Sequence, residues 1–440
     1  MPLKILLLQP TNDVQSGDRL VPPLWASVLS SITPKQHDVD FFHCGFEKPT
    51  EKILANYDIV GISVLTTMAN DAYRVGDMCK KLGVTCIMGG IHVYLFPEEA
   101  KQHCEVVMLG EAEYIWEKIL NDAEKKTLLP QYKGSITDPK DFPIPDLSIY
   151  KKYKFFTTKL AEIVRGCPHN CRFCGATMYS GRKYRYKKVE NLVKEIENWE
   201  GGRRIAHFTN TNLIASPKKT GEIMDQIKDF NLRWWSPCSV DILDHEDLIG
   251  KVAEAGCMVL QFGFDSISKE TLKSMNKQLN IKRDYRKLIK KCHDYGIEIS
   301  GSFIFGWDTD TKDVFRNTVE FAKDADIDFP VYFPLTPFPG TDIYDTYKSQ
   351  GRILTNDWSK YNWNTCVYIP KNMTQAELLS GCHYAFEESY STRNILQRLF
   401  SRPRGLREIM LLLFISASGR FVTWFSKPYW AEGKGVAASF

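Results

Sequence analysis

Three cysteines stand within eight residues in the stretch Arg165-Gly-Cys167-Pro-His-Asn-Cys171-Arg-Phe-Cys174-Gly-Ala176. The other cysteines of the chain are scattered, which favours a metal site in a reducing compartment over a disulfide framework. Three close thiolates can hold a four-iron cluster and leave one iron open to another ligand. Zinc with His169 as fourth ligand, although His169 would crowd a tetrahedral site, and three thiols without metal are the alternatives.

The cysteines directly follow the first strand of a series in which apolar strands alternate with helices. Predicted strands cover residues 160–164, 204–208, 233–236, 258–262, 298–305 and 329–333. Helical spacing is found over residues 189–199, 220–229, 243–255, 269–275, 284–295 and 312–324. Such alternation predicts a parallel sheet, and six units predict a partial (β/α)6 TIM-type barrel over 157–345 whose functional loops follow the strands. An open sheet is the alternative.

An earlier series of the same kind precedes this one. Its predicted strands cover residues 4–8, 39–42, 59–63, 86–88 and 106–109, with helices over 69–82 and 114–120. This α/β pattern predicts a Rossmann-like domain over 1–127 that binds a ligand at the carboxyl ends of its strands. Prolines among charged residues predict a linker over 128–156, and a mostly helical region is expected over 346–440.

Composition limits the function classes. The 440 residues carry 57 Lys plus Arg against 53 Asp plus Glu, and 43% are hydrophobic. This is ordinary for a globular chain with two or three cores, and it excludes a highly basic nucleic-acid coat. No run of 18 apolar residues predicts a spanning helix. The beginning of the chain lacks a signal-type cleavage site, so we expect a cytoplasmic protein, with membrane association as an option.

The spacing Cys167-x3-Cys171-x2-Cys174, with an aromatic Phe173, resembles the signature of the radical S-adenosylmethionine (SAM) enzymes. The resemblance implies a 4Fe-4S cluster held by the three cysteines, with SAM chelating the open iron. A reductant such as flavodoxin or ferredoxin would supply the electron that cleaves SAM to a 5′-deoxyadenosyl radical. The resemblance also implies that Phe173 and Gly175 lie beside SAM.

Three further motifs resemble the same family. They are Thr209-Asn210-Thr211-Asn212, Gly263-Phe264-Asp265-Ser266 and the Gly301–Thr311 stretch around Gly306. The resemblance implies that Thr209, Asn210, Asn212, Asp265 and Gly306 surround SAM. The first motif lacks the acids common in relatives, and Asp265 replaces the usual Glu. Thr336-Pro-Phe-Pro-Gly-Thr341 is similar to the end of the barrel in one branch of the family.

That branch carries a cobalamin-binding domain, which the first domain resembles. Ser63-x-Leu65, Gly89-Gly90 and Gly110-Glu111 occur in the expected order, and the resemblance implies that they face the corrin. The usual cobalt-ligating His loop has Asn12-Asp-Val14-Gln-Ser-Gly17 as its counterpart, and Val14 cannot bind a metal. We therefore expect cobalamin without a His lower ligand, unless the site has decayed; His92 is a weak alternative ligand.

Two basic segments invite other interpretations. Arg182-Lys-Tyr-Arg185-Tyr-Lys187-Lys188 interleaves basic and aromatic residues as RNA-binding proteins do, although packing or cofactor charges explain it better. In the last fifty residues, eight basic residues face two acidic ones and flank apolar residues 409–415. This pattern fits either an interfacial helix and a lipid-like substrate, or a helix that packs over the barrel mouth with snorkelling arginines, which we favour.

Taken together, the resemblance identifies a cobalamin-dependent radical SAM enzyme. It implies methylation of an unactivated carbon of a small-molecule or lipid-like biosynthetic intermediate. Radical oxidation, cyclisation or rearrangement without methyl transfer, tRNA modification, and a non-catalytic corrinoid or redox sensor are the alternatives. No catalytic acid or base can be named, and no nucleic-acid partner is favoured.

Overall fold

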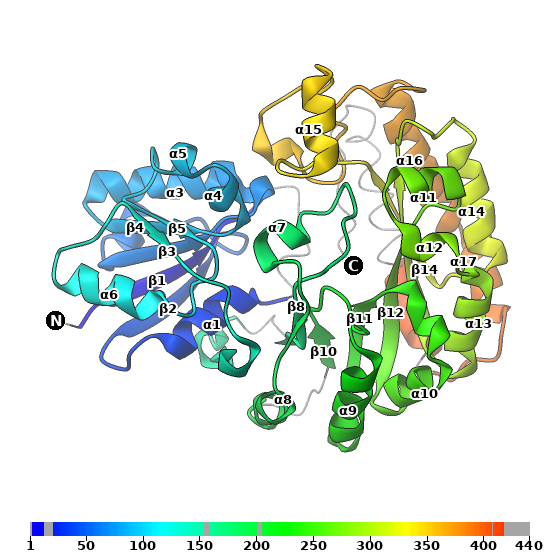
Figure 1. Cartoon of the computed structure of the whole chain (residues 1–440), viewed down its shortest axis with the longest axis horizontal. Coiled ribbons are helices and arrows are strands. Elements are labelled where there is room, and N and C mark those ends of the chain that lie inside the picture. The colour runs from blue at the N-terminus through cyan, green and yellow to red at the C-terminus, as the bar shows by residue number, and fades with distance from the viewer. Residues whose placement is uncertain (1, 13–20, 154–157, 200–204, 407, 418–440) are drawn as a thin grey trace. The chain divides into compact units, whose positions relative to one another are not determined.

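The computed structural model describes residues 2–12, 21–153, 158–199, 205–406 and 408–417. The chain divides into two compact units. Unit 1 contains Met1–Ala161, Met178–Arg203 and Asp357–Ser359, whereas unit 2 contains Glu162–Thr177, Arg204–Asn356 and Lys360–Phe440. Both units are built around parallel sheets, as the alternation of strands and helices predicts (Figure 1).

The sheet of unit 1 has the strand order β2-β1-β3-β4-β5-β6, and its strands are parallel. Its strands are β1 (Lys4–Gln9), β2 (Asp38–His43), β3 (Ile59–Ser63), β4 (Thr85–Gly89), β5 (Val106–Leu109) and β6 (Gln131–Lys133). The order reverses between β1 and β3, which makes their carboxyl ends the expected ligand site of a doubly wound sheet. The predicted Rossmann-like fold is confirmed.

Helices cover this sheet because their apolar faces pack on the buried strand residues. They include α1 (Leu24–Ile32), α2 (Glu51–Leu54), α3 (Ala69–Leu82), α4 (Ile91–Leu95), α5 (Pro97–Ala100) and α6 (Trp116–Glu124). Unit 1 also contains α8 (Val189–Glu197). Trp116 and Ile119 of α6 join Ile5, Ile59 and Ile87 of the strands in one core. Unit 1 is therefore stabilised mainly by apolar burial.

Residues 128–153 are part of unit 1 and do not form an irregular linker. They contain β6, and the aromatic side chains of Tyr132, Tyr150 and Tyr153 are buried in the core. The Tyr150 hydroxyl accepts a hydrogen bond from the backbone N–H of Ser27 (3.1 Å). The prolines that predict a linker indicate only that this segment lacks long helices and strands.

The sheet of unit 2 contains five successive parallel strands in the order β14-β13-β12-β11-β10. They are β10 (Ile205–Phe208), β11 (Arg233–Cys238), β12 (Cys257–Asp265), β13 (Glu298–Phe305) and β14 (Phe329–Pro334). The helices between them include α9 (Pro217–Ile227), α10 (Glu246–Glu254), α11 (Lys269–Ser274), α12 (Gln278–Ile281), α13 (Tyr285–Asp294) and α14 (Val314–Asp324). This consecutive order, with a helix after each strand, is that of a partial barrel.

The strand predicted over 160–164 is divided into β7 (Lys159–Ala161) and β8 (Val164–Arg165). Two short elements follow, α7 (Ala176–Ser180) and β9 (Arg185–Tyr186). The cysteine loop thus lies between β8 and α7.

The C-terminal region is helical, as predicted, with α15 (Asp342–Ser349), α16 (Gln375–Ser389), α17 (Thr392–Phe400) and helical residues 408–417. Leu412 is fully buried against Val259 and Phe329. Because these two residues stand near the amino ends of β12 and β14, this helix does not cover the barrel mouth, contrary to our expectation. Within the described ranges, no helix is both long and apolar enough to span a membrane.

Candidate functional site

The cysteine loop offers three thiols that can hold a metal cluster. None of Cys167, Cys171 and Cys174 forms a disulfide; the first two are half-buried and Cys174 is exposed. Burial raises the pKa of Cys171 to about 11 and also raises the pKa of Cys174. Such thiols become thiolates when a metal binds them. The loop therefore fits an iron-sulfur cluster by its donor atoms.

Contacts from later segments fix the loop. The backbone N–H of Arg172 donates to Met275 O (3.0 Å), while its guanidinium donates to Ser274 O (3.2 Å) and contacts Asp342. The Asn276 amide donates to Asn170 O (2.8 Å). Since these partners belong to α11, α15 and their flanking residues, the loop is held by segments a hundred or more residues away in sequence.

The Thr209–Asn212 loop supports the cysteine loop from the end of β10. The buried Asn210 side chain accepts hydrogen bonds from the N–H groups of Ile163 (2.8 Å) and Val164 (3.1 Å). The Thr211 hydroxyl donates to Gly166 O, next to the first cysteine. These contacts position the backbone that leads into the cluster loop, a task that the sequence did not assign to Thr211.

Asn212 is likewise buried, and its side-chain oxygen accepts from Ser239 N (3.0 Å) and Ile214 N (3.3 Å). Thr209 is half-buried beside it. The two asparagines that the resemblance places around SAM thus make internal hydrogen bonds that organise the carboxyl ends of β10 and β11. Gly175, after the last cysteine, is also half-buried.

Asp265 lies at the end of β12 in a left-handed backbone conformation, with φ at 61°. Its carboxylate is paired with Lys277, whose ammonium also donates to Gly263 O (2.7 Å). The same ammonium lies 5.9 Å from the ring centroid of Phe173. Lys277 therefore joins the Asp265 turn to the aromatic residue of the cysteine loop, and no sequence motif singled it out.

Gly306 ends β13 in a tight turn that requires glycine. Its φ is 100°, and a Cβ there would lie 2.3 Å from the Tyr368 hydroxyl oxygen. The buried Asp310 carboxylate accepts from the N–H groups of Gly306 (2.9 Å) and Trp307 (3.1 Å). Burial raises the pKa of Asp310 to about 6.

Trp307 packs edge-on against Phe173, with ring centroids 5.9 Å apart. Phe173, Asp265 and Gly306 are thus connected through Lys277 and Trp307 at the carboxyl ends of β12 and β13. Among the described residues, the Trp307 indole nitrogen has no hydrogen-bond partner.

The predicted corrin-facing residues of unit 1 meet at the carboxyl ends of β3 and β4. Ser63 pairs with Gly89 across the two strands, and Val64 N donates to Gly89 O (2.8 Å). A Cβ on Gly90, whose φ is 94°, would lie 2.6 Å from Val64 N. Leu65 is 47% exposed beside them. Close backbone packing with an exposed apolar side chain at a strand end fits a bulky, partly apolar ligand such as cobalamin.

Gly110 and Glu111 form a different arrangement. Gly110 has a φ of 89°, and a Cβ there would lie 2.9 Å from Gly134 O. The Glu111 carboxylate is buried in an ion pair with Arg185 and accepts from Thr137 N (2.7 Å). Glu111 thus makes internal contacts that hold the turn and the segment after β6 together.

Of the five basic residues in the segment that could have bound RNA, Arg185 and Lys187 are buried, whereas Arg182, Lys183 and Lys188 are exposed. Arg185 pairs with Glu111, and Lys187 pairs with Glu195 at 2.6 Å, with side-chain exposures of 3% and 1%. Charges so enclosed cannot contact a phosphate backbone. Packing therefore explains this part of the basic and aromatic pattern.

His92 is fully buried between aromatic side chains, and burial lowers its pKa to about 4. This position is unlike that of an accessible cobalt ligand. Val14 and Gly17, on which the absence of a His lower ligand depends, lie outside the described residues.

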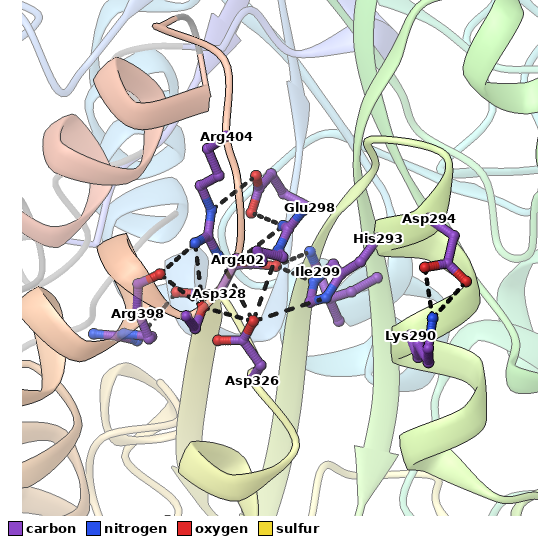
Figure 2. A network of polar contacts seen from close by, with 11 residues as sticks. Lys290, His293, Asp294, Glu298, Ile299, Asp326, Asp328, Arg398, Arg402 and Arg404 are labelled. Carbon is purple, nitrogen blue, oxygen red and sulfur yellow. Dashed lines mark hydrogen bonds and ion pairs between the residues drawn. The ribbon is translucent and has the colours of Figure 1, made fainter.

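A second group of metal-ligand side chains lies at the amino ends of β13 and β14. His293, Glu298 and Asp328 each offer a ligand atom within 4.8 Å of the others. Figure 2 shows that Arg402 and Arg404 enter this group. Arg404 lies 2.7 Å from Asp328 and Arg402 lies 2.8 Å from Glu298, so positive charges already occupy the place of a cation.

Protonation further balances this group. Burial, together with the hydrogen bond that protonated Glu298 donates to the Asp328 carboxylate, raises the pKa of Glu298 to about 10. Burial opposes the ionisation of Asp328, but hydrogen bonds from Glu298 and His293 and the arginine charges hold its pKa below the usual range. One carboxylate thus stays ionised between two guanidinium groups, which is a structural arrangement and not a metal site.

Comparisons with known proteins identify two domain families in this chain. The Radical SAM superfamily model matches residues 161–322, and the B12 binding domain model matches residues 14–120. Bacteriochlorophyllide d C-12(1)-methyltransferase of Chlorobaculum tepidum is 30% identical over 415 residues, covering 91% of this chain and 90% of the relative. Bacteriochlorophyllide d C-8(2)-methyltransferase of the same organism is 32% identical over 403 residues, covering 86% and 88%.

The fold is also that of a solved structure. The radical SAM methyltransferase TsrM from Kitasatospora setae, solved with cobalamin and a 4Fe-4S cluster, superimposes with a TM-score of 0.73. The match covers 96% of this chain and all of TsrM, at 14% sequence identity. The cofactors of this chain are thus a 4Fe-4S cluster, SAM and cobalamin. The chain belongs to the radical SAM superfamily, among the cobalamin-dependent enzymes that combine a B12-binding domain with a radical SAM domain.

Proposed function

We propose that this enzyme transfers a methyl group to an unactivated carbon of a small-molecule or lipid-like biosynthetic intermediate. The observation that carries the proposal is the presence, in one chain, of a loop of three cysteines that form no disulfide and of a glycine-lined edge on a parallel sheet of B12-binding type. The two relatives named as methyltransferases of bacteriochlorophyllide d, matched over nearly their whole length, support methyl transfer over other radical reactions.

The contacts of the residues support the roles that we propose for them. Cys167, Cys171 and Cys174 hold the cluster, and Arg172 keeps their loop in place. Phe173 and Trp307 form an aromatic wall beside it. When bound, the three cofactors supply the electron, the radical and the methyl group, while the protein positions them.

Two carboxylates shape the same site. Asp265 neutralises Lys277, which would otherwise place a bare ammonium beside Phe173. Asp310 holds the N–H groups of Gly306 and Trp307 and so fixes the turn after β13. In unit 1, Ser63, Leu65, Gly89 and Gly90 form the edge for the corrin.

Product analysis after anaerobic reconstitution with iron, sulfide and cobalamin tests this function. Methyl transfer predicts that S-adenosylhomocysteine and 5′-deoxyadenosine form together when a methyl acceptor is present. Formation of 5′-deoxyadenosine with substrate turnover but without S-adenosylhomocysteine would instead indicate oxidation, cyclisation or rearrangement. The matched control is the Cys167, Cys171 and Cys174 to Ala triple variant, which should form neither product.

The proposed function includes a one-electron donor protein such as a flavodoxin or ferredoxin. SAM cleavage needs an electron that the chain itself does not generate. Replacing a chemical reductant by reduced flavodoxin should sustain 5′-deoxyadenosine formation. Failure of both flavodoxin and ferredoxin would contradict this partner class.

A peripheral membrane contact is part of the proposal for a lipid-like substrate. Leu406, Met410, Leu413 and Phe414 are exposed along the C-terminal helical segment, with Met410 at 62% and Phe414 at 72%. Arg398, Arg402 and Arg404, however, pair within the protein and do not serve a lipid surface. Apolar insertion is therefore the expected binding mode.

Sedimentation with anionic vesicles tests the contact. A double variant, Met410→Gln with Phe414→Gln, should lose co-sedimentation. The control variant Leu129→Gln with Ile136→Gln, which changes two exposed apolar residues of unit 1, should retain it. Equal sedimentation of both variants and the wild type would remove the membrane contact from the proposal.

A further inference from the structure

Three residues of the C-terminal region, Asp357–Ser359, belong to unit 1 although the chain before and after them belongs to unit 2. The Asp357 carboxylate accepts from the Asn70 amide (3.0 Å) and from the Ser359 hydroxyl (2.7 Å). The carbonyl of Ser359 accepts from the Asn12 amide (3.3 Å). This tripeptide, which we call the Trp358 anchor, is thus attached on both sides of its tryptophan.

Trp358 itself is buried among side chains of α4 and α5, with 7% of its surface exposed. Its indole N–H donates to the Glu99 carboxylate (2.8 Å). Its ring lies 4.8 Å from that of Phe96 and 5.3 Å from that of His92, centroid to centroid. A buried tryptophan with its N–H satisfied is a strong apolar anchor.

The partners of the anchor all lie at the carboxyl edge of the sheet of unit 1. Asn12 follows β1, Asn70 follows β3, and His92 with Glu99 follows β4. The strand order reverses between β1 and β3, so this edge is where a doubly wound sheet binds its ligand.

The anchor is also connected to the predicted corrin-facing residues. His92, which packs on the Trp358 ring, donates its backbone N–H to Val64 O (3.1 Å). Val64 stands between Ser63 and Leu65 and donates to Gly89 O. A shift of helix α4 would therefore move the turn at Ser63–Leu65 and the turn at Gly89–Gly90, both of which are predicted to face the cofactor.

We propose that Trp358 is a positioning residue of the cobalamin site, which it holds in its binding shape without touching the reacting atoms. By packing on His92 and binding Glu99, Trp358 fixes the turns at Ser63–Leu65 and Gly89–Gly90. Cobalamin binding by the first unit consequently depends on three residues encoded after the SAM-binding strands. This inference rests on the cobalamin-dependent reaction proposed above.

Titration of the full-length protein with hydroxocobalamin, followed by absorbance, tests the proposal without any turnover. Trp358→Ala should weaken cobalamin binding about tenfold or more, while iron content and SAM binding stay at the wild-type level. Trp358→Phe, which keeps an aromatic ring but loses the N–H donor, should restore part of the affinity. The absorption spectrum of the bound cobalamin should also change in Trp358→Ala.

Trp116→Phe is the matched control. Trp116 is buried in the same unit, and its indole N–H donates to the Thr33 hydroxyl (2.9 Å), but it lies in α6 away from the anchor. The control therefore removes the same kind of hydrogen bond and should leave the cobalamin affinity and spectrum unchanged. A loss of affinity equal to that of Trp358→Phe would overturn the proposal, because it would indicate a general effect on stability.

Failure of the wild-type chain to bind cobalamin would refute the proposed function, whereas equal affinity in wild type and Trp358→Ala would refute only the anchor. If Trp358→Ala does not fold, Asn70→Ala decides instead. It removes the exposed hydrogen bond to Asp357, leaves the core intact, and should still weaken binding by about threefold. An unchanged affinity in the folded Asn70→Ala variant would then overturn the proposal.

Discussion

The two ends of the sheet in unit 2 use charged and polar groups in opposite ways. At the carboxyl ends, Asp310 and Asn210 accept hydrogen bonds mainly from backbone N–H groups, and Asn210 supports the loop that carries the three cluster cysteines. At the amino ends, Asp328 and Glu298 are enclosed by arginines from the C-terminal segment (Figure 2). The carboxyl ends therefore keep side chains that can bind a cofactor. The charged side chains at the amino ends are instead paired in contacts that stabilise the fold, as is general for barrels of this kind.

The largest effect should come from the carboxyl ends of the strands, where the cysteine loop lies. Cys171→Ser removes a cluster ligand, so iron content and 5′-deoxyadenosine formation should fall to background, with little change in the free energy of unfolding. Iron analysis and product chromatography measure this. Cys292→Ala is the control, since Cys292 is buried in α13, and it should keep its iron. A Cys171→Ser protein with a full cluster would break the comparison.

The acids and arginines at the amino ends of the strands should have a large effect on the free energy of unfolding. Asp328→Asn leaves Arg402 and Arg404 without their buried anionic partner, and we expect a loss of about 3–5 kcal/mol in the free energy of unfolding. Urea denaturation of the reconstituted protein measures this. The cluster content per folded molecule should stay at the wild-type value. A variant with the free energy of unfolding of the wild type but without a cluster would show that the two ends of the sheet are coupled.

A smaller, pH-dependent effect should come from Asp310, which has no cation paired with it in the contacts that hold it. Its pKa is raised from 3.8 to about 6 by burial, so its contribution to stability is fully present below pH 3.8 and is lost as pH rises through 6. Asp310→Asn can still accept from Gly306 and Trp307. The variant should therefore gain stability relative to wild type between pH 5 and pH 8, by up to about 3 kcal/mol.

Denaturation curves at several pH values measure this difference. The control is Asp308→Asn, because the Arg352 side chain lowers the pKa of Asp308 despite burial and the sign of the effect should be reversed. Parallel pH profiles for Asp310→Asn and wild type would contradict the expectation.

The smallest effect should come from an exposed ion pair near the arginine network. Lys290 and Asp294 lie one turn apart on α13, with side-chain exposures of 76% and 48% (Figure 2). Water and salt screen such a pair, so Lys290→Ala should unfold at the wild-type denaturant concentration within error. A clear loss of stability would mean that the arginine network extends to the surface of α13.

The sequence predicted those parts of the fold and site that depend on residues close to one another in the chain. Strand and helix alternation predicted both sheets, and one continuous motif predicted the cluster loop. Lys277, Thr211 and Trp358 were missed because their roles depend on contacts between distant segments. Asn210 and Glu111 belong to recognisable motifs, yet their side chains make internal bonds, which no motif can show.

The two wrong predictions have the same physical cause. Prolines in residues 128–153 indicated a linker, but the apolar faces of Tyr132, Tyr150 and Tyr153 are buried in the core of unit 1. The arginines of the tail were expected to snorkel along a helix over the barrel mouth, whereas two of them, Arg402 and Arg404, pair with acids at the amino ends of β13 and β14. Charge counted along a sequence does not include its partners in space.

The arginine network also determines when the enzyme is complete during its synthesis. Asp328 is made well before Arg402 and Arg404, so the nascent barrel holds this carboxylate with His293 as a partner but without its guanidinium partners until residues 402–404 have left the ribosome. The carboxyl edge of unit 1 likewise gains its contacts with Asp357–Ser359 only after the strands of unit 2 have been made. A chain cut before Arg402 would therefore lack the ion pairs with Asp328 but keep the Trp358 anchor, so the two units complete their contacts at different points of synthesis.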